Sequence, residues 1–179
     1  MKSFRIKKLK QAKMTDINIF IQNEYEKYNI DDVKIHKDTL KIADYIFSQD
    51  EIIEKSCLKD MKNYSIFFDI VLMNNEEIHR INREYRQKDS PTDVITFAIY
   101  ADSKPEERFN FDNEIHLGEI MISLDRIEEQ AKDNNVTFND ELYFIISHGI
   151  LHLLGFDHLT QEDYNFMVEN QNLAKAIVL

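Results

Sequence analysis

The chain contains little cysteine, glycine or proline, with one, three and two of these residues among 179. The single cysteine, Cys57, cannot close an intramolecular disulfide, which argues against a disulfide-stabilised secreted domain and fits a reducing compartment. We interpret Cys57 as a small buried hydrophobe in a helix, without a function. No apolar run is long enough to span a bilayer, and the N-terminus lacks the apolar stretch of a secretory signal. We therefore expect a cytoplasmic protein with no membrane partner.

The chain also lacks an excess of positive charge, since its formal net charge is −11. Phosphate binding depends on Lys and Arg, so an acidic protein is a poor general binder of nucleic acid, and we expect no DNA partner. Six basic residues and no acidic residue lie within residues 1–13, which leaves 16 basic against 33 acidic residues in the remainder. We interpret residues 1–13 as a basic N-terminal extension and residues 14–179 as the domain. Any RNA site within that domain must be a local patch.

Hydrophobic periodicity predicts one domain of mixed secondary structure, and the sequence contains neither repeats nor low-complexity tracts. Runs of alternating, β-branched or aromatic residues predict strands at 16–22, 64–73, 94–99 and 118–124. Apolar spacing near 3.6 residues and capping signals predict helices at 37–56, 75–87, 138–154 and about 161–174, with a shorter helix after residue 124. Residues 101–114 are polar and predict an exposed connection. We therefore predict a single α+β domain with a mixed, roughly four-stranded sheet and packed helices.

Residues 148–158 contain three of the six histidines and two of the three glycines. His148 and His152 are spaced i, i+4 and share one helix face, so His158 can join them only if the chain turns back after the helix. Gly155 is placed to end the helix in the left-handed conformation and make that turn. Three imidazoles around one ion leave a fourth position for water, as in catalytic zinc sites. The segment therefore predicts a zincin-like metal-binding helix, with His148, His152 and His158 as ligands.

This histidine spacing matches the metzincin proteases, whose motif places a catalytic Glu directly after the first His. Gly149 occupies that position here, so the general base of peptide hydrolysis is absent. Asp157 and Asp93 are candidate replacements, and we favour a role for Asp157 in orienting a ligand imidazole. Gly149 itself indicates either space for a substrate beside the metal or close helix packing, and the sequence leaves both open.

Residues 148–158 resemble the His-Gly-x-Leu-His-Leu-x-Gly-[Tyr/Phe]-Asp-His signature of the YbeY endoribonucleases. Residues 81–97 (INREYRQKDSPTDVITF) resemble the family's asparagine, Tyr-Arg, Lys-Asp and Thr-Asp-Val segment, and residues 117–120 resemble its Leu-Gly-Asp-Ile strand. Two positions depart from the pattern: Glu119 replaces the usual Asp, and Thr96 replaces the usual Ser. Both keep the type of functional group, so they affect fine geometry rather than activity.

The resemblance implies a zinc-like ion at the three histidines and a phosphate-facing, catalytic Arg86. On the sequence alone Arg86 would be an ordinary solvated helix residue. A metal ion can polarise a phosphoryl oxygen, and an Arg fork stabilises charge developing on a phosphate. The family likeness thus implies a metal-dependent endoribonuclease of single-stranded ribosomal RNA, acting in 16S rRNA 3′-end maturation and ribosome quality control.

The partners implied by the resemblance are ribosomal RNA and the small ribosomal subunit, with a ribosomal protein or an assembly GTPase as further candidates. A set of three histidines suits Zn²⁺, and also Ni²⁺ and other divalent ions. Two other functions stay open on the sequence: a ribosome-assembly factor with a structural metal, and a zincin-type peptidase, which Gly149 disfavours.

Overall fold

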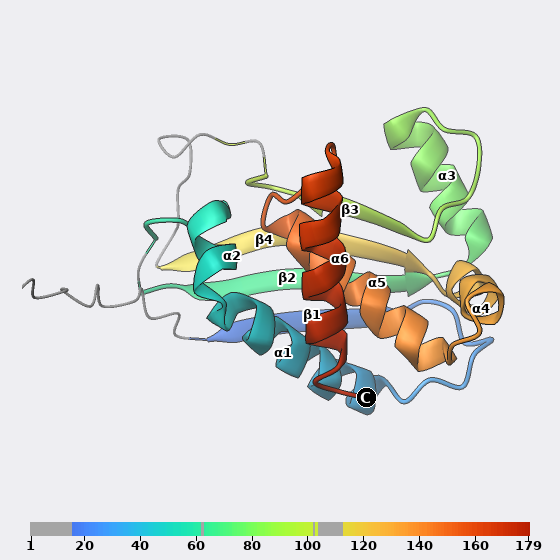
Figure 1. The fold of residues 1–179 in the computed structure, drawn as a ribbon. Helices are drawn as coiled ribbons and strands as arrows, with labels where there is room; N and C mark the ends of the chain where they lie inside the picture. The colour runs from blue at the N-terminus through green and yellow to red at the C-terminus, as the bar shows by residue number, and fades with distance from the viewer. Residues whose placement is uncertain (1–15, 62, 102, 104–112) are drawn as a thin grey trace, which may run out of the picture.

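The computed structural model of the chain contains a four-stranded sheet with helices on both faces (Figure 1). It describes residues 16–179 except residues 62, 102 and 104–112. The predicted basic extension and most of the predicted polar connection at 101–114 lie outside the described residues. The strands are β1 (Ile17–Asn23), β2 (Ser65–Met73), β3 (Val94–Ala98) and β4 (Glu114–Ser123). The helices are α1 (Asp32–Ser48), α2 (Asp50–Lys55), α3 (Asn75–Arg86), α4 (Leu124–Asp133), α5 (Phe138–Leu153) and α6 (Gln161–Lys175).

The sheet has the strand order β1-β2-β4-β3, which confirms the predicted mixed sheet. β1, β2 and β4 are parallel, and β3 runs antiparallel to β4 at one edge. Side chains of a strand alternate between faces, and every second residue of β2 is at most 2% exposed: Ile66, Phe68, Ile70 and Leu72. This face of the sheet therefore carries the main core.

The helices form unequal layers on the two faces of the sheet. α1 and α5 pack against the main-core face, and α6 lies across them on the outside (Figure 1). α3 packs against the opposite face beside β3 and β4, where it closes a smaller core cluster that contains Met73, Ile78, Ile81 and Ile95. α5 is thus held between the sheet and α6, with its C-terminal end beside β3.

The predicted single helix at 37–56 is wrong, because two helices occupy this region. The Asp31 carboxylate accepts a hydrogen bond from the Lys34 amide (2.9 Å), which starts α1 five residues earlier than predicted. Gln49 has extended backbone angles (φ −81°, ψ 112°) and separates α1 from α2. Cys57 is buried as predicted but lies in the turn that follows α2 rather than in a helix.

The predicted start of the last strand at Gly118 is also wrong, since β4 begins at Glu114. The register between β2 and β4 shifts by one residue beside Gly118, which has φ +127°. A Cβ atom on Gly118 would lie 1.9 Å from the Phe97 carbonyl oxygen. Gly118 therefore marks a β-bulge inside the strand, a position that glycine also favours.

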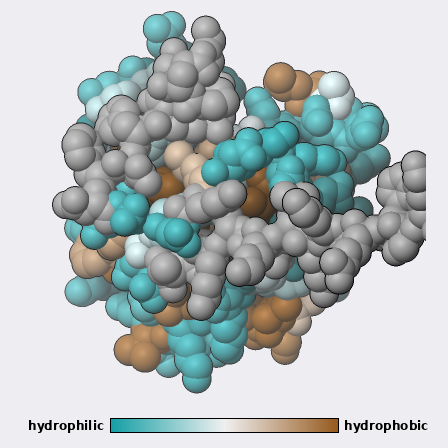
Figure 2. Space-filling model, turned by 90° about the vertical axis from the view of Figure 1, so that its left-hand side faces the viewer, coloured by the Kyte–Doolittle hydropathy of each residue, from teal (hydrophilic) through white to brown (hydrophobic). Residues whose placement is uncertain are grey.

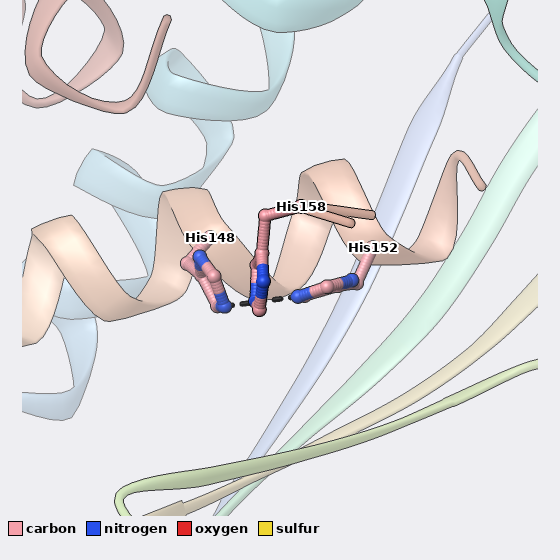
Figure 3. Close-up of side chains that lie close together, drawn as sticks. All are labelled: His148, His152 and His158. Atoms are coloured by element: carbon pink, nitrogen blue, oxygen red, sulfur yellow. Dashed lines mark hydrogen bonds between the residues drawn. The ribbon is translucent and has the colours of Figure 1, made fainter. Parts of the chain in front are cut away.

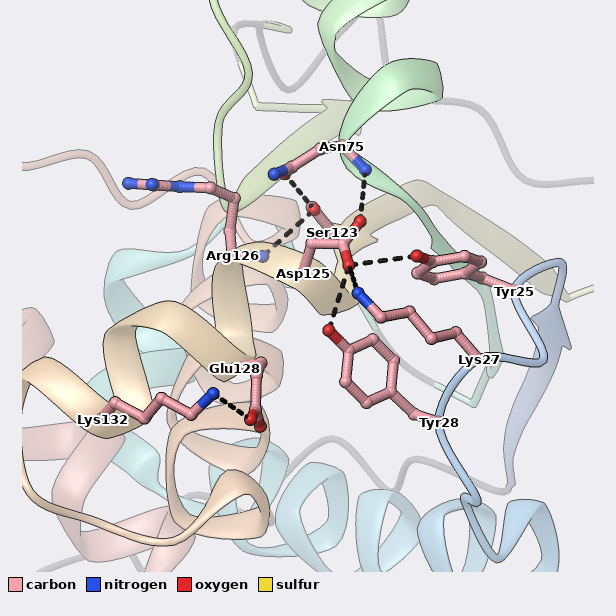
Figure 4. Close-up of polar contacts among 9 residues, drawn as sticks. All are labelled: Tyr25, Lys27, Tyr28, Asn75, Ser123, Asp125, Arg126, Glu128 and Lys132. Atoms are coloured by element: carbon pink, nitrogen blue, oxygen red, sulfur yellow. Dashed lines mark hydrogen bonds and ion pairs between the residues drawn. The ribbon is translucent and has the colours of Figure 1, made fainter.

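Asp125, at the start of α4, joins three segments of the chain (Figure 4). Its Oδ1 accepts hydrogen bonds from the Tyr25 hydroxyl (3.1 Å), the Lys27 ammonium (2.8 Å) and the Tyr28 hydroxyl (3.0 Å). Its Oδ2 accepts one from the Asn75 amide (3.1 Å), at the N-terminus of α3. This network ties the β1–α1 connection to α3, the helix that carries the predicted catalytic arginine.

The described surface is mixed in character. Figure 2 shows the side of the molecule at the left of Figure 1, where hydrophilic side chains surround separate hydrophobic patches. Among the described helices, none combines the length and the apolar character needed to cross a membrane.

Candidate metal centre

α5 begins with the predicted capping box, in which Thr137 and Asp140 bond each other's backbone. Its residues are largely buried, and Gly149 is among them. A Cβ atom on Gly149 would lie 2.6 Å from Cγ2 of Ile120 on β4. Of the two interpretations of Gly149, close helix packing is therefore confirmed, and the missing side chain leaves no room for a substrate.

α5 ends in the predicted left-handed turn, with Gly155 at φ +91°. The Gly155 amide donates to the His152 carbonyl (3.0 Å), and the Phe156 amide donates to the Leu151 carbonyl (3.1 Å). This pair of bonds is the Schellman pattern of helix ends. The turn reverses the chain and returns His158 to the face that carries His148 and His152.

The three histidines converge in space (Figure 3). Their ligand nitrogens all lie within 4.8 Å of one another, and Nε2 of His148 is 2.9 Å from Nε2 of His152. Nitrogens that bind one tetrahedral zinc ion at 2.0–2.1 Å are about 3.4 Å apart, so a small adjustment suffices. The donor set and the spacing therefore fit a metal ion held by His148, His152 and His158.

The electrostatic environment keeps two of these imidazoles neutral. Burial is the largest cause that lowers the pKa of His148, and the neighbouring His152 and His158 lower it further, to about 4, against an opposing effect of Asp93 and Asp157. Burial and His158 also lower the pKa of His152. Metal ions bind the neutral imidazole, so both side chains are in the ligand-competent form near pH 7.

Gln171 on α6 is a residue of this site that the sequence analysis missed. Its side chain is 1% exposed, and its amide nitrogen Nε2 lies 2.5 Å from Nδ1 of His148. A histidine that binds a metal through Nε2 carries a proton on Nδ1, so metal binding requires the Gln171 amide to turn over and present its oxygen as the acceptor. Gln171 is 23 positions from His148 and belongs to no motif, so only the packing of α6 on α5 reveals it.

The two candidate carboxylates differ in how fully they are bonded. Asp93 accepts hydrogen bonds from the Val94 amide (2.8 Å), the Thr92 hydroxyl (3.1 Å) and the Gln130 amide (3.1 Å). Asp157 is exposed; its Oδ1 accepts the His158 amide (2.8 Å) and lies 4.0 Å from His158 Nδ1. Both raise the pKa of His148 through their charge, so the fold places both near the metal centre.

Arg86 is the last residue of α3, and its charge is close enough to lower the pKa of His152. Within the described part of the chain its guanidinium has no hydrogen-bond or ion-pair partner. Three other arginines, Arg80, Arg83 and Arg126, are paired with carboxylates. The predicted phosphate-facing residue is thus an exposed cation whose charge acts on His152.

The two departures from the family pattern lie on opposite faces of the sheet. Thr96 on β3 lines the cleft that contains His152. Glu119 on β4 lies on the α3 face beside Tyr85 and Phe97, and burial, followed by the charge of Asp69, raises its pKa. Of these two positions, only Thr96 is therefore placed to affect the metal centre directly.

The chain is similar to known proteins along most of its length. The family described as Endoribonuclease YbeY matches residues 20–176. A relative from Fusobacterium nucleatum subsp. nucleatum is 47% identical over 106 residues, which cover 59% of this chain and 63% of the relative. A relative from Oceanobacillus iheyensis is 36% identical over 141 residues, which cover 78% of this chain and 92% of the relative. Both relatives carry the name Endoribonuclease YbeY.

The fold also has a solved counterpart. The solution structure of TM1509 from Thermotoga maritima is similar at a TM-score of 0.54 and 27% identity, covering 89% of this chain and 88% of that one. The match to the Fusobacterium protein spans less than two thirds of that protein, whereas the Oceanobacillus match spans nearly all of its relative. Because the family match includes almost the whole described chain, the protein belongs to the YbeY family.

Proposed function

We propose that the protein is a metal-dependent endoribonuclease that cuts single-stranded ribosomal RNA in 16S rRNA 3′-end maturation and ribosome quality control. The observation that carries this proposal is the convergence of three histidine nitrogens within 4.8 Å in a chain of the YbeY family. The relatives' shared name supports the reaction class. The proposed setting is the cytoplasm, with the small ribosomal subunit, and a ribosomal protein or assembly GTPase, as partners.

The proposed metal is one Zn²⁺ per chain, with Ni²⁺ as the other candidate, held by His148, His152 and His158. A bound divalent ion supplies Lewis acidity toward a phosphoryl oxygen. The lowered pKa values of His148 and His152 keep these side chains unprotonated near pH 7, so that no proton competes for the ligand positions.

Arg86 is proposed to bind the phosphate beside the histidines. A guanidinium without a protein partner can form two parallel hydrogen bonds to phosphate oxygens. Those bonds strengthen as negative charge builds up during cleavage, which stabilises the transition state. The proposed contribution of Arg86 is therefore to catalysis and substrate binding, not to the metal.

The carboxylates are assigned by their existing bonds. Asp157, next to His158 in sequence and 4.0 Å from its ring, is proposed to orient that imidazole. Asp93 already accepts three hydrogen bonds, which favours a fixed electrostatic role over proton transfer. If a carboxylate serves as general base, the exposed Asp157 is the better candidate.

The test compares His148→Ala and Arg86→Glu with wild type on a 16S rRNA 3′-end fragment, with cleavage ends mapped and metal content measured. We expect His148→Ala to lose both metal and cleavage, and Arg86→Glu to keep the metal and lose cleavage. Arg80→Glu, on an exposed turn of the same helix, is the matched control and should cleave normally.

Three outcomes would contradict the proposal. Equal cutting by wild type and His148→Ala would show that the nuclease is elsewhere or is a contaminant. Binding of pre-ribosomes without cutting, together with unfolding when a chelator is added, would indicate an assembly factor with a structural metal. Cleavage of a peptide panel in place of RNA would indicate a zincin-type peptidase.

A further inference from the structure

A cleft of about 440 Å³ lies directly beside the metal centre. One wall is formed by residues 96–99 and Ala101, and the other by His152, Gly155, Phe156 and Asp157 at the end of α5. His152 belongs both to this cleft and to the histidine group. One molecule could therefore place one part in the cleft and an adjoining part at the metal. The volume lies in the range of sites for small organic groups, about 300–1,000 Å³.

The charge of the described lining makes the cleft better suited to a neutral group than to a phosphate. Its described lining contains no Lys or Arg, and it does contain the Asp157 carboxylate. An anion would be repelled there, whereas a neutral group with N–H donors would be attracted. The histidine group, which shares His152 with the cleft, is the proposed position of the phosphate, so the cleft suits an uncharged part of the same molecule.

The edge strand supplies polar backbone groups to this cleft. The Asp93 carbonyl accepts from the Ser123 amide and the Ile99 amide donates to the Leu117 carbonyl, each at 2.9 Å. Backbone groups alternate along an antiparallel ladder, so the intervening residues Thr96 and Ala98 direct their N–H and C=O away from β4. These groups are spaced donors and acceptors at the open edge of the sheet, beside the histidines.

The Thr96 side chain adds an unused hydroxyl. Its Oγ1 is buried and has no hydrogen-bond partner within the described structure. An unpaired buried hydroxyl costs free energy, and Thr96 is itself one of the residues that line the cleft. A ligand with polar edges would therefore supply a partner that the protein does not.

We propose that this cleft binds one nucleobase of the RNA, on a nucleotide that adjoins the phosphate at the three histidines, and prefers bases that carry an exocyclic amino group. The inference rests on the proposed RNA cleavage. In this site the Asp157 carboxylate accepts a hydrogen bond from the amino group. The Thr96 hydroxyl and the β3 backbone form hydrogen bonds with the other polar atoms of the base, and Phe156 contributes an apolar wall.

The first test measures equilibrium binding to the zinc-loaded protein with three probes: cytidine 5′-monophosphate, uridine 5′-monophosphate and ribose 5-phosphate. We expect the cytidine nucleotide to bind most tightly and ribose 5-phosphate most weakly. Thr96→Val, which removes the hydroxyl at nearly constant shape, should weaken cytidine nucleotide binding about 2- to 10-fold and leave ribose 5-phosphate unchanged.

The second test combines the variant with an altered RNA. Oligonucleotides with one cleavage site carry either a normal or an abasic nucleotide on each side of the scissile phosphate in turn. For wild type, the abasic residue on one side should slow cleavage. Thr96→Val should slow cleavage of the normal RNA by a factor similar to that of the abasic substitution. On that abasic RNA, Thr96→Val and wild type should cleave equally fast, because the variant and the abasic nucleotide remove the same contact.

Thr39→Val is the matched control, since Thr39 Oγ1 is also buried without a partner in the described structure, but Thr39 lies on the core-facing side of α1. Both variants remove an unpaired hydroxyl and should be at least as stable as wild type, and only Thr96→Val should weaken nucleotide binding.

Equal binding of all three probes by a protein that cuts RNA would overturn the base site alone. Tighter binding of the cytidine nucleotide by a protein that cuts no RNA would overturn the cleavage proposal and leave the base site standing. Binding of an extended peptide along β3, with no preference for nucleotides, would overturn both.

Discussion

Both halves of α5 carry polar side chains that are buried or half-buried, but their surroundings satisfy these side chains in different ways. In the N-terminal half, the Tyr143 hydroxyl donates to the Asp38 carboxylate (3.0 Å), which also accepts from Lys34 (2.5 Å) and Lys41 (2.8 Å). In that cluster, each hydrogen-bond donor and each charge has a partner within the protein. In the C-terminal half, by contrast, imidazole nitrogens of like character face one another at 2.9 Å.

This difference suggests that the N-terminal half of α5 serves stability and the C-terminal half serves ligand binding. A buried polar group with a protein partner stabilises the fold, whereas buried groups that converge on a shared space need a ligand to complete them. The matched cluster should therefore respond to substitution through stability, and the histidine cluster through metal binding and catalysis. Each prediction below tests one side of that contrast.

The largest expected effect is on the histidine side. His152→Ala should lower the affinity for Zn²⁺ at least about 100-fold, because two nitrogens cannot replace a set of three. Isothermal titration calorimetry would measure it. The contrast would break if His152→Ala lowered the melting temperature of the metal-free protein as strongly as a core deletion does.

Gln171→Leu should weaken Zn²⁺ binding about 10- to 100-fold, because it removes the side-chain amide that contacts His148 Nδ1 and that, turned over, accepts the Nδ1 proton of a metal-bound His148. Gln171→Glu keeps an acceptor at the same position and should retain most of the affinity. The same titration measures both variants, and ¹⁵N NMR of His148 would report a shift in the tautomer for Gln171→Leu alone. Equal affinities for the two variants would assign Gln171 to packing only.

Gly149→Ala tests the junction between the two halves. The added Cβ meets Ile120 on β4, so we expect a loss of about 1–3 kcal/mol in the free energy of unfolding. Denaturant unfolding of the metal-free protein would measure this. A variant as stable as wild type would show that α5 is not packed closely at this point.

The smallest effect is expected at Asp38. Burial alone would raise its pKa, but hydrogen bonds from Lys34, Lys41 and Tyr143 outweigh it and lower the pKa to about 2. A lowered folded-state pKa gives stability that is present above about pH 4 and is lost as the pH falls toward 2. Asp38→Asn should lower the free energy of unfolding by about 1 kcal/mol at pH 7, a modest amount because the two lysines are half-exposed. The variant should also lose less stability than wild type as the pH falls. Urea unfolding between pH 2 and 5 would measure it, and an unchanged slope would contradict it.

The sequence was sufficient where local signals act alone. The capping boxes of α5 and α6, the left-handed turn at Gly155 and the i, i+4 pair of histidines depend on residues close in the chain, and the structure confirms each. The single helix at 37–56 and the strand start at Gly118 were wrong, because an extended Gln49 and a bulge depend on tertiary packing.

The candidate site was predictable in part for the same reason. The three histidines and Asp157 share one short segment, so their spacing was enough to bring them together. The position of Arg86 came only from the family likeness. Gln171, the bonds that fix Asp93 and the cleft beside Thr96 join distant segments, and no local pattern indicates such contacts.

The three predicted ligands differ in how firmly the fold holds them. His148 and His152 project from a packed helix, whereas His158 follows the turn at Gly155 and its side chain is 46% exposed. If these residues hold the ion as proposed, we expect metal exchange to need only a local motion of the exposed turn at His158, with the helix and its core still folded. The ion bound at any moment would then depend on which divalent metals the surroundings provide.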